Sequence, residues 1–201
     1  MLHRREFLRH SAFGLTASTI GGWPAMLGAK AGPDGYAIPL TMTDIRVAMT
    51  VTIGGQGPLL VALDTGGQLS LIDRDVADYL KLPSAGGLNL SVGGRLDRYG
   101  LRLARDVVFG GQFRQAEAVF AETEHVRFGE GVVASLAAGT LASFDSELDF
   151  NAMQIRVYPD GGPARSGWAA SKGALEPARV AGLSPLLKAD VRLGDRTVRA
   201  I

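Results

Sequence analysis

The run Leu59-Leu60-Val61-Ala62-Leu63-Asp64-Thr65-Gly66-Gly67 constrains the fold of this chain more than any other segment. Five apolar residues of strand-forming type lead directly into a carboxylate, a hydroxyl and two glycines. Burial disfavours the charged form of a carboxylate, so an aspartate at the inner end of a buried strand is costly unless the protein uses it. Thr65 can hydrogen-bond within the turn, and Gly66, which has no Cβ, allows backbone or ligand to approach closely. The run predicts a buried strand that delivers Asp64 to a functional turn.

Alternating apolar residues and glycine-rich turns on both sides of this run predict a domain made mostly of strands. Residues 46–53 alternate with a period of two, residues 54–58 read as a turn, and residues 59–63 return as the second strand of a hairpin. The same reasoning predicts hairpins further along the chain. Their strands are 88–92 with 98–103, 106–109 with 113–120, and 147–150 with 154–158.

Two short helices are also predicted. Asp73 is a good N-cap for a helix that runs through Lys81 and that Pro83 ends. A second helix is expected from Leu136 to Phe144, with Ser135 as its cap.

Asp64-Thr65-Gly66 lies between an apolar strand and the segment Leu69-Ser70-Leu71-Ile72-Asp73. This arrangement resembles the active-site loop of the aspartic proteases, in their bacterial and retroviral-like branch. The resemblance implies an all-β, acid-protease (retropepsin-like) closed-barrel lobe over residues 36–160, with one or two short helices. It also implies that Asp64 is the catalytic aspartate, that the Thr65 hydroxyl braces the loop, and that Gly66 leaves room beside it.

Further positions are interpreted through the same resemblance. Gly67 stands where the family usually has Ser or Ala, so a small residue is kept but a side-chain hydrogen bond to the carboxylate is lost. Ala134 stands where the family has a glycine that lies under the catalytic loop. Gly93 and Gly94 are expected at the tip of a flap that closes over the substrate and excludes water.

The chemistry that the resemblance implies needs two carboxylates that share one proton, one to activate a water and one to polarise the scissile carbonyl. This chain supplies Asp64, so the second carboxylate is expected from a second lobe or from a homodimer partner across a two-fold axis. The expected activity is that of an endopeptidase on a polypeptide substrate bound as an added strand, with no cofactor and no metal. The alternatives are a non-catalytic peptide- or ligand-binding module on the same fold, and an all-β periplasmic ligand carrier.

Composition argues against other chemistries. The chain has no cysteine, and His125 is the only histidine after residue 31, which disfavours thiolate, zinc and serine-type catalysis. Without residues 1–31, 17 Lys and Arg stand against 19 Asp and Glu, a net charge of −2. This net charge does not indicate the basic surface that nucleic-acid-binding proteins need.

The N-terminus has the pattern of an export signal. Arg4 and Arg5 are followed by a mildly apolar stretch from Ser11 to Leu27 and by the small-residue site Ala29-Lys30-Ala31. A Tat-type signal peptide is therefore expected at residues 1–31, with export by the Tat machinery to the periplasm or outside the cell. A membrane-anchored form is the less favoured alternative, because glycines and Pro24 interrupt the apolar stretch.

The last residues repeat the layout that precedes Asp64. Residues 189–201 form a strand, a glycine turn and a strand, as do residues 49–54 and 60–63. Residues 161–183 are expected to be a linker and residues 184–201 the start of a second lobe, truncated here. We expect an apolar residue and Asp-Thr-Gly or Asp-Ser-Gly to follow Ile201 in the natural gene. The alternative is a fortuitous hairpin.

Overall fold

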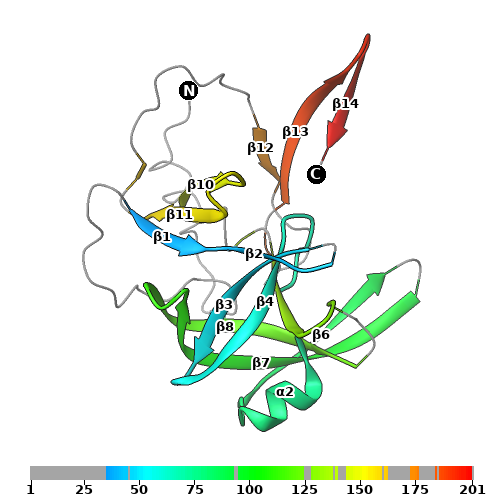
Figure 1. The fold of residues 1–201 in the computed structure, drawn as a ribbon. Coiled ribbons are helices and arrows are strands. Elements are labelled where there is room, and N and C mark those ends of the chain that lie inside the picture. Colours follow the sequence, from blue (N-terminus) through cyan, green and yellow to red (C-terminus); the bar gives the residue numbers. More distant parts are fainter. Residues whose placement is uncertain are drawn as a thin grey trace.

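The computed structural model describes residues 35–44, 46–92, 95–124, 128–137, 139, 144–159, 161–162, 173–176, 184 and 186–200 (Figure 1). The elements with defined bounds are β1 (Tyr36–Pro39), β2 (Thr41–Met42), β3 (Val47–Ile53), β4 (Gln56–Asp64), β5 (Leu71–Asp73), α2 (Arg74–Tyr79), β6 (Ser84–Val92), β7 (Arg95–Phe109), β8 (Phe113–Thr123), β9 (Val132–Ala137), β10 (Asp145–Asp149), β11 (Gln154–Tyr158), β12 (Gly173–Glu176), β13 (Leu186–Leu193) and β14 (Arg196–Ala200). None of the helical residues in the described ranges belongs to a helix with the length and hydropathy needed to span a membrane.

Six strands of the largest sheet close into a barrel. Their order is β3-β4-β9-β5-β8-β7, and β3 also pairs with β7, which joins the two ends of the series. The closing pairs include Val51 with Phe109 and Ile53 with Val107. Closure leaves these six strands without a free edge, while β2 and β6 extend the sheet on the outside. The prediction of an all-β closed-barrel lobe is confirmed.

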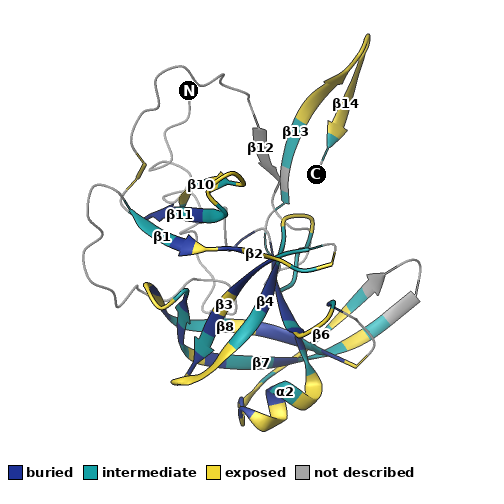
Figure 2. Ribbon diagram, viewed as in Figure 1, coloured by how far each residue is buried: buried dark blue, intermediate teal, exposed yellow. Residues whose placement is uncertain are grey.

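Apolar side chains fill the barrel because they recur at every second residue of the strands. Met49, Val51 and Ile53 of β3 are buried, and Thr50 between them is exposed. Their partners in the core include Ile72 and Phe120, both almost fully buried. Figure 2 shows buried stretches along the barrel strands β3, β4 and β8.

A second sheet, β1-β11-β10, packs on the same core. Aromatic contacts join it to the barrel, since the ring of Tyr36 lies 5.4 Å from that of Phe113, and Phe113 meets Phe144 edge-on at 5.2 Å. Ile38 and Ile155 belong to the same buried cluster as the barrel residues. The barrel and the second sheet therefore share one main hydrophobic core.

Two predictions from periodicity were wrong in detail. Ser135, Leu136 and Ala137 do not begin a helix but end strand β9, which lies between β4 and β5. A short apolar run buried on both faces has no period that distinguishes strand from helix. The turn predicted at residues 54–58 is also shorter, because β4 already begins at Gln56.

The predicted hairpins are confirmed, and so is the helix cap. β6 pairs with β7, β7 with β8, and β10 with β11, all antiparallel. Oδ1 of Asp73 accepts hydrogen bonds from the backbone N–H groups of Asp75 and Val76, at 2.9 and 3.3 Å. Helix α2 begins directly after this cap and ends at Tyr79, shortly before the predicted end.

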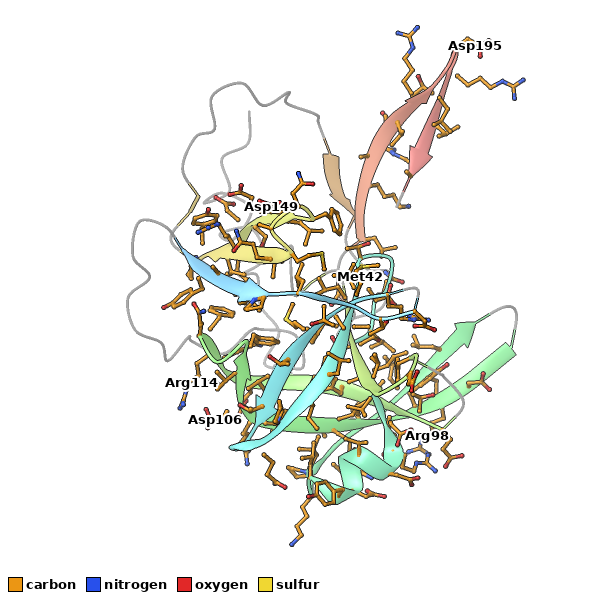
Figure 3. All side chains as sticks on the ribbon, in the orientation of Figure 1. Met42, Arg98, Asp106, Arg114, Asp149 and Asp195 are labelled. Carbon is orange, nitrogen blue, oxygen red and sulfur yellow. The ribbon has the colours of Figure 1, made fainter. Side chains whose placement is uncertain are left out.

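The C-terminal residues form a third sheet, β12-β13-β14, in which β13 and β14 make the predicted hairpin. Asp195 marks its tip, which projects away from the barrel (Figure 3). Val191, Leu193 and Val198 on this hairpin are exposed. Strand β12 lies within the range predicted as a linker.

This third sheet has the same connectivity as β2-β3-β4. In both sheets a middle strand pairs antiparallel with the strand before it and the strand after it. Val191 faces Val198 across the hairpin, and Val51, at the matching position of the repeat, faces Leu59.

Several sequence predictions lie outside the described residues. They are the leader at 1–31, the flap tip at Gly93 and Gly94, His125, most of the expected second helix, and Ile201.

Candidate active site

Asp64 is the last residue of β4, and its strand neighbours fix its position. β4 runs parallel to β9, and Asp64 is opposite Ala137 at the end of that pairing. Both strands belong to the closed barrel, so the backbone that carries the carboxylate is held on a rigid element. The chain then turns, since the N–H of Gly67 donates to the carbonyl oxygen of Asp64 at 3.2 Å.

The Asp64 carboxylate forms a hydrogen bond within its own turn. Its Oδ1 accepts a hydrogen bond from the backbone N–H of Gly66 at 3.2 Å. The side chain is neither fully buried nor fully exposed. A half-buried carboxylate with one backbone donor can take part in proton transfer while remaining reachable by water.

The side chains of the other residues in the predicted loop make fewer contacts that would hold the loop in place. Thr65 and Gly66 are exposed, and Gly67 is half-buried. Among the hydrogen bonds of the described residues, none involves the Thr65 hydroxyl. The bracing role expected for Thr65 therefore stays a prediction.

Ser70 braces the loop, and sequence reasoning missed it. Its Oγ accepts a hydrogen bond from the N–H of Ala137 at 3.0 Å, and its carbonyl oxygen accepts one from Ala121 at 2.8 Å. One residue thus joins the returning chain to the strands β9 and β8. A serine between Leu69 and Leu71 was the available signal, because a polar residue in an apolar segment needs a partner.

A distant part of the chain also meets the loop. The N–H of Ser184 donates to the carbonyl oxygen of Gln68 at 2.8 Å. Ser184 precedes β13, so the segment that enters the third sheet is in contact with the turn that carries Asp64.

Ala134 lies in β9, opposite Val61 on one side and Ile72 on the other. It is 2% exposed and belongs to the main core cluster. Its methyl group is therefore accommodated as part of the core.

The hairpin that the sequence predicted as a flap is formed by β6 and β7. The backbones of Val92 and Arg95 pair at its described end. Because the tip lies outside the described residues, closure over Asp64 stays a prediction.

The described residues hold no group of three or more His, Cys, Asp or Glu side chains placed to bind a metal ion. The chemistry that the loop itself offers is that of a carboxylate.

Part of the chain is similar to a known protein family. Residues 49–141 match the aspartyl protease family. This segment contains most of β3, all of β4 to β9, and therefore the whole Asp64 turn and the strands that carry it. Over these residues the chain is similar to the aspartyl protease family.

Two solved structures are similar to the chain. One is a retropepsin-like aspartic protease from Rickettsia conorii, 15% identical, which covers 61% of this chain and 90% of its own, with a TM-score of 0.42. The other is the retroviral protease-like domain of Ddi1 from Leishmania major, 12% identical, covering 60% and 98%, with a TM-score of 0.38. No curated protein sequence matches the chain significantly.

Proposed function

We propose that this chain is an aspartic endopeptidase lobe in which Asp64 is one of two catalytic aspartates. One observation carries the proposal: a half-buried Asp64, in an Asp-Thr-Gly turn at the end of a barrel strand, lies within the segment that matches the aspartyl protease family. A carboxylate at the end of a central strand is costly to bury, and a turn with no function would not need one there.

The reaction requires Asp64 and a second carboxylate to hold one proton between them. The ionised carboxylate takes a proton from a water, whose oxygen attacks the carbonyl carbon of the peptide bond. The protonated carboxylate gives its proton to the carbonyl oxygen. The C–N bond then breaks as the carboxyl that took the water's proton gives it to the amine nitrogen. One hydroxyl of the tetrahedral intermediate returns its proton to the other carboxylate, and a carboxylic acid and an amine leave.

The second carboxylate comes from a second lobe or from a second copy of the chain. The shared connectivity of β2-β3-β4 and β12-β13-β14 favours a second lobe, because the latter sheet repeats the strands that lead to Asp64. The exposed Val191, Leu193 and Val198 would lie in the core of that lobe.

A mixing experiment separates the two sources. A constant amount of active wild-type protein is mixed with increasing amounts of the Asp64→Asn variant, under conditions in which subunits exchange. A homodimer loses activity, because mixed dimers hold one defective aspartate. A two-lobed chain keeps its activity, because each molecule contains both carboxylates.

The peptidase itself is tested on unfolded polypeptide substrates, with products identified by mass spectrometry. We expect internal cleavage that pepstatin inhibits. Binding of pepstatin or peptides without any cleavage would instead favour the non-catalytic binding module.

Export is proposed from the sequence pattern of residues 1–31. Residues 1–35 are fused to a folded reporter, and Arg4 and Arg5 are replaced together by Lys. We expect the reporter to remain in the cytoplasm, since the Tat pathway requires the paired arginines. Normal export of the double variant would contradict the Tat assignment.

A further inference from the structure

Glycine at position 67 is not required by the backbone. The φ angles of Gly66 and Gly67 lie outside the left-handed region, whereas those of other turn glycines, such as Gly54 and Gly55, lie inside it. A φ angle outside the left-handed region is open to residues with a side chain. Another cause must therefore be sought for a glycine here.

The space next to Gly67 supplies that cause. A Cβ atom at this position would lie 2.8 Å from Oδ2 and 3.0 Å from Cγ of Asp64. Ordinary contacts of a Cβ begin at about 3.4 Å, so the carboxylate would have to move by about 0.6 Å. The Asp64 carboxylate thus occupies the volume that a side chain at position 67 would fill.

Position 66 is different. A Cβ there would lie 3.8 Å from Oδ1 of Asp64, which is an ordinary van der Waals contact. Two adjacent glycines with similar backbone requirements therefore differ in their relation to the same carboxylate.

We propose that Gly67 is a positioning residue: its missing side chain lets the Asp64 carboxylate lie against the turn, where Oδ1 accepts a hydrogen bond from the N–H of Gly66 and Oδ2 occupies the space that a Cβ at position 67 would need. This inference rests on the proposed function for its catalytic meaning. One hydrogen bond holds the carboxylate, and a second, from the N–H of Gly67 to the backbone carbonyl oxygen of Asp64, holds the turn. A side chain at position 67 would displace Oδ2 and rotate the carboxylate away from the N–H of Gly66.

The structural test compares crystal structures of Gly67→Ala and Gly66→Ala. In Gly67→Ala the carboxylate should be displaced and its hydrogen bond to the residue 66 N–H lost or lengthened beyond 3.5 Å, the limit of a hydrogen bond. In Gly66→Ala the carboxylate should keep its place. An unmoved carboxylate in Gly67→Ala would overturn the inference.

The kinetic test measures kcat and KM of Gly67→Ala on a cleaved peptide. Because the carboxylate moves and the substrate-binding surface does not, kcat should fall about tenfold or more, while KM should stay within about twofold. An unchanged kcat beside a displaced carboxylate would overturn the positioning role. If the wild-type protein cleaves nothing, the proposed function fails, and the crystal structures still decide whether Gly67 sets the carboxylate.

A stability cycle covers the case in which Gly67→Ala folds poorly. The same substitution is made in the Asp64→Ala variant, which has no carboxylate to displace. We expect Gly67→Ala to lower the melting temperature in the wild-type background and to be nearly neutral in the Asp64→Ala background. An equal loss in both backgrounds would show that the carboxylate is not what opposes a side chain at position 67.

Discussion

Nε of Arg102 lies 2.7 Å from Oε2 of Glu122, and this pair joins β7 to β8 where the β6-β7 hairpin leaves the barrel. The same guanidinium reaches Asp78 of helix α2 at 2.8 Å and the carbonyl oxygen of Leu82 at 3.0 Å. The hydrogen bond with Glu122 raises the pKa of Arg102. Because the pKa is raised in the folded state, the cation contributes fully to the stability of the fold at every pH below the ordinary pKa of arginine. This stabilisation is lost only as the pH rises through the raised pKa of the folded state.

Removal of this guanidinium should destabilise the protein. Arg102→Ala leaves Glu122, which is 14% exposed, without its shortest partner, and we expect the free energy of unfolding to fall by about 2 kcal/mol. Arg105→Ala on the same strand is the control, because its pair with Glu117 is 67% and 40% exposed and should contribute less than about 1 kcal/mol. Urea denaturation at neutral pH measures both. Equal decreases in the free energy of unfolding for the two variants would contradict the larger contribution assigned to Arg102.

The cap of helix α2 gives a second prediction. Asp73→Ala removes the acceptor of two backbone N–H groups and should lower the free energy of unfolding by about 1 kcal/mol. Asp73→Asn keeps an acceptor and should be nearly neutral. Thermal denaturation of the two variants checks this, and a loss as large for Asn as for Ala would show that the cap does not stabilise the helix.

Ala134 should contribute to stability rather than disturb the loop. Ala134→Gly removes a methyl group from a core position and adds backbone freedom to a strand. The expected loss is about 1 to 2 kcal/mol in the free energy of unfolding. If the glycine variant were more stable, the methyl group would be strained in its core position, contrary to the packing described above.

Ser135 allows the opposite prediction. Its hydroxyl is buried and has no hydrogen-bond partner among the described residues. Ser135→Ala removes an unpaired polar atom from an apolar site, so the free energy of unfolding should rise by up to about 1 kcal/mol. A decrease of similar size in chemical denaturation would mean that the hydroxyl has a partner.

The sequence predicted those elements that depend on residues close together in the chain. The alternation in residues 47–53, the Asp73 cap and the glycine turns each depend on a few neighbouring residues, and the structure confirms them. Strand β9 could not be recognised, because its short apolar run is mostly buried and its sheet partners β4 and β5 lie far away in the sequence. Barrel closure between Val51 and Phe109 is likewise a long-range property.

The same distinction holds for the site. Asp64, Thr65 and Gly66 formed a recognisable triplet in the sequence. The role of Ser70, whose hydroxyl meets Ala137 across 67 positions, required the fold. The packing of Asp64 on Gly67 is local in sequence, yet it depends on a side-chain rotamer that no sequence pattern specifies.

The most direct measurement is kcat/KM for cleavage of an unfolded polypeptide by the wild-type protein and by Asp64→Asn. The substitution keeps the size of the side chain and an acceptor for the Gly66 N–H but removes the ionisable oxygen. Asp75→Asn, an exposed change of the same kind, is the control and should keep full activity. We expect Asp64→Asn to lose at least about three orders of magnitude in kcat/KM with an unchanged melting temperature. Cleavage by Asp64→Asn at close to the wild-type rate would contradict the account.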